Sequence, residues 1–337
     1  METLDVLQNI WYFIIGFLFI GYAVLDGFDL GIGSLMPVLA KNDEEKLTLF
    51  NSIWPLWDGN EVWLVTAGAA LFAAFPYAYA TVFSGFYLAL MLVLFALIFR
   101  AVSIEFWYYD EKRRPLWSIT FFLGSIIPSL LFGVALGNII VGIPLDANTD
   151  FTGNFFTLLR PYPLSLGVLG LSAIFMQGCT YTMMKTEGPL QNRARALGEK
   201  LWLFFIIALA LSFIMTLIYM PASLARTGVW LGAVVTVLPW ILNRSFIKKG
   251  MDARAFFMSS LSFAGLWILA GATHYPNLVK ARNDPGLSLT IANASSTELT
   301  LKVMLGIALS VMPIVLIYSV FVHRVFRGKA PSGYGGH

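Results

Sequence analysis

Long apolar runs constrain the fold of this chain more than any other feature. Nine runs lie between charged breaks, at approximately residues 9–33, 53–75, 78–99, 117–142, 162–184, 201–220, 228–247, 255–273 and 300–323. Each is close to the roughly 20 residues that an α-helix needs to cross a bilayer core. Only 12% of the residues are charged, about half the usual share for a soluble domain. The sequence therefore predicts an all-α integral membrane protein with about nine transmembrane helices.

The second run is the least secure of the nine, because its start, Trp54 to Glu61, is polar. It is interpreted either as a true span or as a re-entrant segment, and the second reading leaves eight spans. Basic residues decide the orientation. If the N-terminus lies outside, 17 of the 22 Lys and Arg residues fall on the inner side. The positive-inside rule then places the C-terminus in the cytoplasm.

Four acids lie in or beside the first two runs. Asp26 and Asp29 are near the end of the first, and Asp58 and Glu61 are at the start of the second. Within a helix, residues three apart share a face, so all four are expected to converge as buried groups in one layer near the inner surface. Burial of a carboxyl in a membrane is costly, and such acids often mark a proton path or a cation site.

Other interpretations of these acids remain open at this point. They can cap helix ends, bind backbone amides or pair with Arg100, which ends the third run. A secondary transporter with a carboxylate coupling-ion site is an alternative function, although its acids would be expected in both halves of the chain near mid-membrane. A purely structural scaffold, in which the acids are dispensable, is a third possibility.

The remaining chemistry-bearing residues give weaker signals. The three histidines, His274, His323 and His337, never share a run, so this chain cannot by itself offer the paired histidines of a membrane b-type haem. No His, Cys or Glu cluster has the spacing of a zinc site. Tryptophans near the inner ends of the runs, Trp57 among them, are typical of interfacial anchors.

Several motifs together resemble subunit II of the cytochrome bd-type quinol oxidases, including the cyanide-insensitive branch. The two most specific are Asp26-Gly27-Phe28-Asp29-Leu30-Gly31-Ile32-Gly33 and Trp57-Asp58-Gly59-Asn60-Glu61-Val62-Trp63. Shorter ones follow: Phe72-Ala73-Ala74-Phe75-Pro76, Phe83-Ser84-Gly85-Phe86-Tyr87, Phe99-Arg100, Phe151-Thr152-Gly153-Asn154-Phe155-Phe156, Gln177-Gly178 and Asn293-Ala294-Ser295-Ser296. The resemblance extends over nearly the whole chain.

The resemblance implies an enzyme complex of the bacterial inner membrane that reduces dioxygen to water with electrons from membrane quinol. It implies no catalytic residue, haem or metal in this chain. Two b-type haems, one d-type haem and the quinol site are expected in a partner, subunit I, and very small single-span subunits are further expected partners. A structural quinone or lipid on this chain is left open, and nucleic acid is not an expected partner.

The implied fold is two four-helix bundles with a peripheral ninth helix. It divides the chain into residues 1–145 (spans 1–4), residues 146–327 (spans 5–9) and a flexible cytoplasmic tail, residues 328–337. By resemblance, Asp58 matches a position proposed to feed protons from the cytoplasm, and Trp63 matches one that lines the apolar entrance for dioxygen. Asp26, Asp29 and Arg100 match polar positions near the subunit interface. The predicted proton pathway thus comprises Asp58, Asp26, Asp29 and Glu61, with Arg100, Trp57 and Asn60 as interface or structural polar residues.

Overall fold

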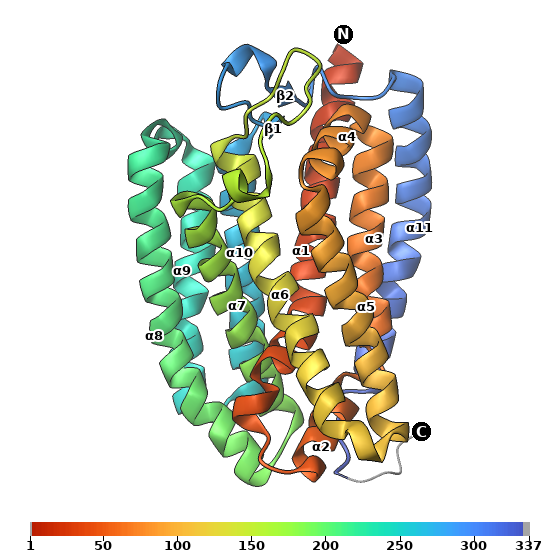
Figure 1. The fold of residues 1–337 in the computed structure, drawn as a ribbon, viewed down its shortest axis with the longest axis vertical. Coiled ribbons are helices and arrows are strands. Elements are labelled where there is room, and N and C mark those ends of the chain that lie inside the picture. The colour runs from red at the N-terminus through yellow and green to blue at the C-terminus, as the bar shows by residue number, and fades with distance from the viewer. Residues whose placement is uncertain (1, 333–337) are drawn as a thin grey trace.

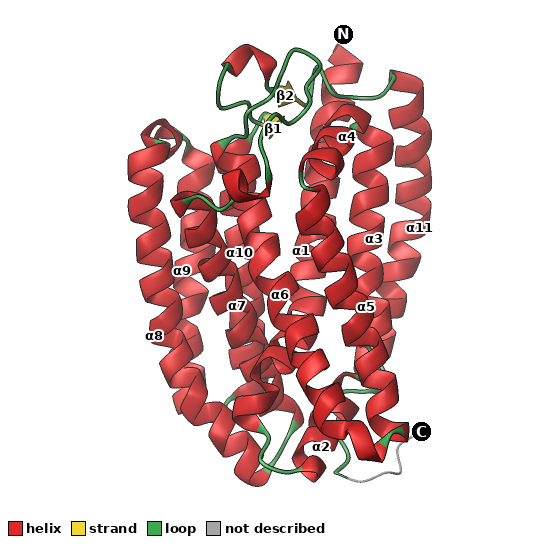
Figure 2. Cartoon of the chain, in the orientation of Figure 1, coloured by secondary structure: helices red, strands yellow, loops and turns green. Residues whose placement is uncertain are grey.

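The computed structural model describes residues 2–332, which form an elongated bundle of helices (Figures 1 and 2). The α-helices are α1 (Glu2–Leu39), α2 (Asp43–Ile53), α3 (Trp57–Ala74), α4 (Pro76–Gly85), α5 (Tyr87–Tyr109), α6 (Arg114–Val141), α7 (Pro161–Lys185), α8 (Gly188–Tyr219), α9 (Thr227–Lys248), α10 (Asp252–His274) and α11 (Glu298–Val325). Short 3-10 helices occur at η1 (Glu111–Arg113), η2 (Phe155–Leu158), η3 (Pro221–Ala225) and η4 (Pro285–Leu287). The predicted all-helical fold is confirmed.

Eight of the described helices are long and apolar enough to cross a membrane: α1, α5, α6 extended by η1, and α7 to α11. The other predicted span is α3, whose first turn carries Asp58 and whose side packs against α1 and α11. It is a continuous helix of 18 residues that runs alongside these neighbours (Figure 1). The polar residues at its start made this run the least secure prediction. The same residues make α3 less apolar than the eight helices named above.

Several boundaries differ from the predicted ones. Helix α1 continues past Gly33 to Leu39, because the residues beyond Gly33 stay apolar up to the charged turn at Lys41. The third run, predicted at 78–99, is divided between α4 and α5, with the break at Phe86. Helix α2 occupies the segment between the first two predicted runs, where no helix was predicted. It begins at the N-cap Asn42, whose side chain accepts a hydrogen bond from the Glu45 amide.

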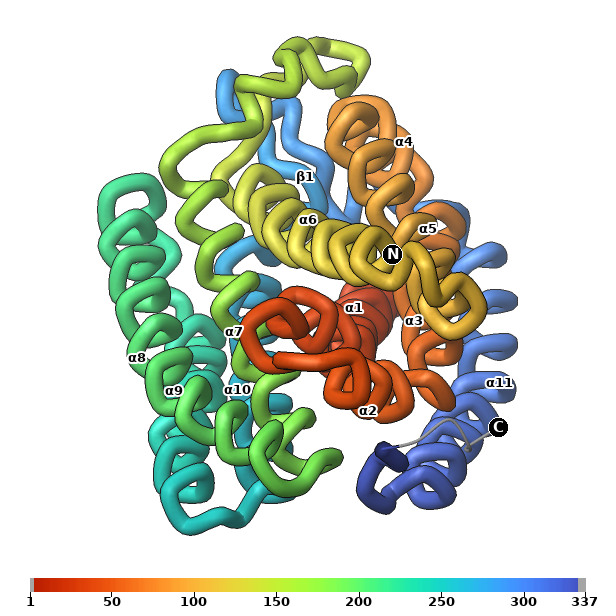
Figure 3. Tube along the Cα trace, turned by 60° about the horizontal axis from the view of Figure 1, so that its bottom comes forward, coloured from red at the N-terminus to blue at the C-terminus, as the bar shows by residue number. Residues whose placement is uncertain are grey.

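Helix α1 lies at the centre of the bundle. It contacts α3, α6, α7 and α10, which surround it in the view from the α2 end (Figure 3). Close approach to α7 depends on Gly31 and Gly178, where a Cβ atom on either residue would lie within 2.6 Å of the opposing backbone. Small residues are the usual means by which membrane helices pack closely. The acids of α1 are therefore held on a rigid, central element.

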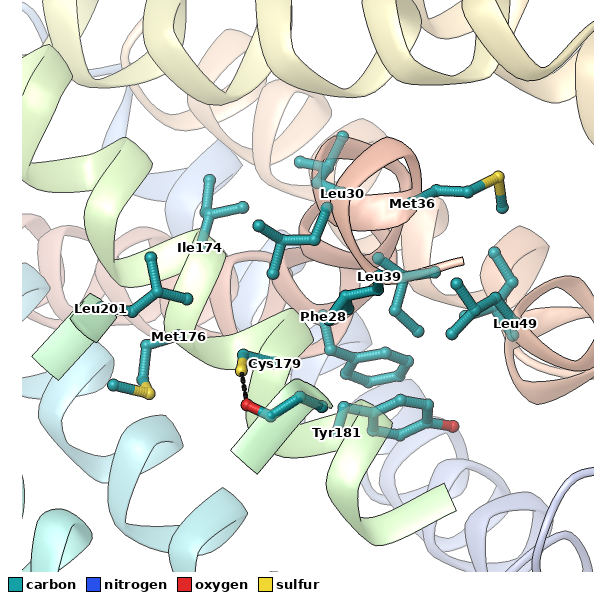
Figure 4. Close-up of a cluster of buried hydrophobic side chains, with 14 of the residues drawn as sticks. Phe28, Leu30, Met36, Leu39, Leu49, Ile174, Met176, Cys179, Tyr181 and Leu201 are labelled. Atoms are coloured by element: carbon teal, nitrogen blue, oxygen red, sulfur yellow. Dashed lines mark hydrogen bonds between the residues drawn. The ribbon is translucent and has the colours of Figure 1, made fainter. Parts of the chain in front are cut away.

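A cluster of buried apolar side chains joins α1, α2 and α7 below this contact. Phe28 stacks on Tyr181 with ring centroids 4.0 Å apart, and the Tyr181 hydroxyl donates to the Ser52 carbonyl of α2 at 3.0 Å (Figure 4). Offset aromatic pairs of this kind stabilise a core beyond the area they bury. This packing closes the bundle at the end where α2 lies.

The opposite end carries the loops. Strands β1 (Asn277–Val279) and β2 (Leu289–Thr290) pair antiparallel, and bridges join Ile143 to Ala281 and Leu145 to Phe151. The end that holds α2 and the C-terminal side of α11 is called the basic end below, because the sequence predicts most Lys and Arg residues there. Of the predicted tail, residues 328–332 are described and 333–337, including His337, lie outside the described residues.

Candidate functional site: a carboxyl layer around Arg100

Asp26 of α1 and Arg100 of α5 form a bidentate ion pair in the interior. Arg100 Nη1 donates to Asp26 Oδ2 at 3.0 Å and Nη2 donates to Oδ1 at 2.5 Å. Both residues have no exposed area. A guanidinium matches the geometry of a carboxylate, and two parallel hydrogen bonds partly offset the cost of burying both charges. The interpretation in which an acid pairs with Arg100 is therefore confirmed for Asp26.

Glu61 of α3 reaches the same guanidinium from another side. Its Oε1 lies 3.4 Å from Arg100 Nη2, and its side chain remains 26% exposed. One guanidinium thus faces two carboxyl groups, from α1 and α3. With both carboxyl groups ionised, this set of three side chains is not neutral, because two negative charges share one positive charge.

Asp29 has a different partner from Asp26, although both belong to one motif. Asn60 of α3 donates its side-chain amide to Asp29 Oδ2 at 2.8 Å and more weakly to the Leu25 carbonyl at 3.3 Å. Asp29 has no exposed area, and its Oδ1 has no hydrogen-bond partner within the described residues. Asn60, predicted as a structural polar residue, thus ties α3 to α1 beside the ion pair.

Asp58 is the exception to the expected burial. It lies in the first turn of α3 with an exposed side chain, where a negative charge interacts favourably with the helix dipole. The prediction that all four acids are buried is therefore wrong for Asp58, since this turn lies at the surface of the chain. Trp57 beside it is half-buried and packs against the apolar cluster around Phe28.

Trp63 lies farther along α3 and faces α1. Its ring fills the space above Gly21, where an added Cβ would come within 2.1 Å of the indole, and the residue is 6% exposed. Leu18, Tyr22 and Ala67 complete the buried cluster around it. The environment of Trp63 is therefore apolar, and it adjoins the carboxyl layer through Tyr22.

Tyr22 is a residue that the sequence reasoning missed. It is 5% exposed and lies one turn before Asp26 on α1, and its hydroxyl is buried without a hydrogen-bond partner among the described residues. The four-residue spacing from Asp26 was the available signal. Tyr22 therefore connects the polar layer with the apolar cluster of Trp63.

The carboxyl groups of the layer can bind protons. Asp26 and Glu61 face the Arg100 guanidinium, Asp29 lies one turn from Asp26 on α1, and such a set approaches neutrality when protons bind to the carboxyls that lack a cationic partner. Among residues 2–332, no group of three or more His, Cys, Asp or Glu side chains is arranged to hold a metal. The roles predicted for the individual acids stay predictions.

Comparisons with known proteins agree with the resemblance seen in the motifs. A family model described as cytochrome bd terminal oxidase subunit II matches residues 7–326. The cytochrome bd-I ubiquinol oxidase subunit 2 of Escherichia coli K12 is 37% identical over 366 residues, covering 98% of this chain and 96% of that protein. The cytochrome bd ubiquinol oxidase subunit 2 of Bacillus subtilis is 34% identical and covers 96% of both chains.

A solved structure shows the same fold. A chain of the bd oxidase from Geobacillus thermodenitrificans superposes with a TM-score of 0.79 over 95% of this chain and 98% of that chain, at 17% sequence identity. The predicted family and the predicted multi-pass membrane fold are thus both confirmed. With a family match over almost its full length and relatives above 30% identity, this chain belongs to the cytochrome bd terminal oxidase subunit II family.

Proposed function

We propose that this chain is the non-haem subunit of a quinol oxidase that reduces dioxygen to water. Two b-type haems, one d-type haem and the quinol site belong to a subunit I partner. The full-length similarity to proteins named as ubiquinol oxidase subunit 2 supports this assignment. We further propose that the basic end faces the cytoplasm, in accord with the positive-inside rule.

The carboxyl layer supplies protons to the haem site of the partner. The observation that carries this proposal is a gradient of exposure along one route. Asp58 is exposed, Glu61 is 26% exposed and touches Arg100, and Asp26 beyond Arg100 is fully buried. Asp58 and Glu61 are three residues apart on α3 and so share a helix face. Protons from the basic end would thus bind first at Asp58 and reach the interior through Glu61, with Asp26 and Asp29 as the buried acceptors.

Trp63 borders the route by which dioxygen enters. Its buried ring lies among Leu18, Tyr22 and Ala67, and an apolar environment suits an apolar gas. Tyr22, a member of this cluster, marks the boundary between the proposed dioxygen route and the carboxyl layer. Small single-span subunits and a structural quinone or lipid are further expected partners.

The division into a first bundle, residues 1–145, and a second bundle with the last helix, residues 146–327, stays a prediction. Helix α11 packs against α1 and α3, so the last helix lies beside the first group of helices. The acids lie in one half of the chain and the family is that of an oxidase subunit, and both observations disfavour the transporter alternative.

The test is to purify the chain with its membrane partners, record a haem spectrum and measure quinol-driven oxygen uptake. Asp58→Asn and Asp58→Ala are expected to slow uptake at unchanged haem content, whereas Asp58→Glu retains it. Glu199→Gln, an exposed acid on α8, is the matched control and is expected to be neutral. A preparation without any haem-bearing partner would overturn the assignment, and full activity in both Asp58 variants would remove Asp58 from the proton route.

A further inference from the structure

Lys185, the last residue of α7, is a buried cation at the basic end. It is only 6% exposed, and its Nζ donates to the carbonyl oxygens of Phe326 and, at 3.2 Å, of Gly328. The face of Tyr181 lies 5.7 Å from Nζ. Within the described residues no ion pair joins Lys185 to an acid. Carbonyl dipoles alone leave the positive charge of this ammonium uncompensated.

A second lysine reaches the same place from the C-terminal segment. Residues 326–331, here called the clasp, cross the ends of α7 and α2. Lys329 Nζ donates to the Thr186 carbonyl at 2.9 Å, and the Ala330 amide donates to the Lys185 carbonyl at 2.8 Å. Asn51 of α2 donates to the Pro331 carbonyl at 2.8 Å. The clasp therefore places a second ammonium near Lys185, again without a carboxylate partner among the described residues.

The two lysines line one cavity. It has a volume of about 210 Å³ and is bounded by Asn51, Ser52 and Pro55, by Lys185, and by Val325 and residues of the clasp. A water molecule occupies roughly 30 Å³ in the liquid, so the cavity has room for a group several times larger. Amide and hydroxyl groups from Asn51 and Ser52 add polar atoms to the wall. Among residues 2–332, no acid contributes to the lining.

We propose that this cavity binds a phosphate group, either of an anionic phospholipid or as free phosphate. Lysine ammonium groups bind phosphate as point charges, and a phosphate would supply the negative charge that the two lysines lack. The site lies at the end of the bundle expected to face the cytoplasmic leaflet, whose anionic lipids attract basic residues. Beside it, the exposed apolar face of α11, including Val325 at 57% exposure, offers a surface for acyl chains. This site is separate from the carboxyl layer and from the proposed oxygen chemistry.

The test uses the assembled complex, reconstituted in nanodiscs of phosphatidylcholine alone or with phosphatidylglycerol. Native mass spectrometry measures retained lipid, and a thermal scan measures the unfolding midpoint. A third arm adds inorganic phosphate to phosphatidylcholine nanodiscs. We expect phosphatidylglycerol to be retained and to raise the midpoint of the wild type. If inorganic phosphate raises the midpoint equally, the anion alone is the ligand, which also supports the site.

Variants locate the binding. The double variant K185Q/K329Q is expected to retain at least tenfold less phosphatidylglycerol, and Lys185→Arg is expected to retain wild-type levels. K248Q/K249Q removes two exposed lysines at the same end and serves as the control. The proposal is overturned if K185Q/K329Q binds as much phosphatidylglycerol as the wild type or loses no more than the control. It is also overturned if neither phosphatidylglycerol nor phosphate shifts the wild-type midpoint, a result that does not depend on any variant folding.

Discussion

Arg100 and Asp26 meet in a fully buried, bidentate ion pair that links α5 to α1, and Glu61 of α3 approaches the same guanidinium at 3.4 Å. Three helices are thus joined through one side chain. Removing one member of such a pair leaves the other charge buried without compensation, which is more costly than removing both.

This asymmetry gives the first prediction. Arg100→Met is expected to destabilise the protein by about 3–5 kcal/mol, because the Asp26 carboxylate loses its partner. The double variant D26L/R100M is expected to recover most of that loss. The measurement is the thermal unfolding midpoint and the yield of assembled complex. If the double variant is as unstable as R100M, then the ion pair itself, and not the unpaired charge, accounts for the stability.

Asn60 provides the second prediction. Asn60→Leu removes the amide that donates to Asp29 at 2.8 Å and is expected to cost about 1–3 kcal/mol, the usual penalty for a buried polar group left unpaired. In an Asp29→Leu background the same change is expected to cost much less. A double-mutant cycle on the unfolding midpoint checks this. Equal losses in both backgrounds would show that Asn60 acts through another contact.

Close packing of α1 on α7 gives the third prediction. A Cβ on Gly31 would lie 2.3 Å from the Ile174 carbonyl oxygen, a backbone atom that can move only with its helix. Gly31→Ala is therefore expected to lower stability by about 1–3 kcal/mol. Gly16→Ala, on the same helix with no atom within 4 Å of the added Cβ, is expected to stabilise by roughly 0.5–1 kcal/mol. Similar midpoints for the two variants would contradict this account of the helix contact.

The pH dependence of the basic end gives the fourth prediction. Burial by itself raises the pKa of Glu45, but the ion pair with Arg193 and the hydrogen bond from the Lys41 amide outweigh it and lower the pKa below its usual 4.5. A lowered folded-state pKa gives a stabilisation that is fully present above pH 4.5 and is lost as the pH falls through the folded-state value.

Glu45→Gln checks this by removing the titrating group. The difference in unfolding midpoint between wild type and variant is expected to be greatest near neutral pH and to vanish at the acid end. Its size is at most about 1 kcal/mol, because the pair is partly exposed to solvent and is screened by salt. If the difference in midpoint instead grows as the pH falls, folding raises the pKa of Glu45, which contradicts the lowered pKa.

The sequence predicted the parts of the fold that depend on hydrophobicity. Apolar runs located the spans, because a bilayer requires such runs regardless of how helices pack. Helix α2 was missed although Asn42 and Glu45 carry an N-capping signal, since its buried face of Leu47, Phe50 and Ile53 is hidden among charged residues. The ends of α1 and the break between α4 and α5 depend on tertiary packing, which periodicity does not report.

The sequence predicted which residues belong to the candidate site, but it did not predict which of them pair with one another. Spacing placed Asp26 with Asp29 and Asp58 with Glu61, but Asp26 turns to Arg100 while Asp29 turns to Asn60. Partner choice depends on where α3 and α5 pass α1, which is a long-range property. For the same reason the burial of Asp58 was overestimated, because its place at the start of α3 leaves it outside the packed interior.

The clasp at Lys185 has a consequence for the order of events during synthesis. Lys185 of α7 donates to the carbonyl of Phe326, which lies 141 residues later in the chain. The ribosome therefore makes α8 to α11 before this contact can form. Domains and helices assemble as they emerge, N-terminal parts first. The basic end of the growing protein therefore stays open until α11 has entered the membrane, and lipid or water can occupy the space beside Tyr181 throughout that interval.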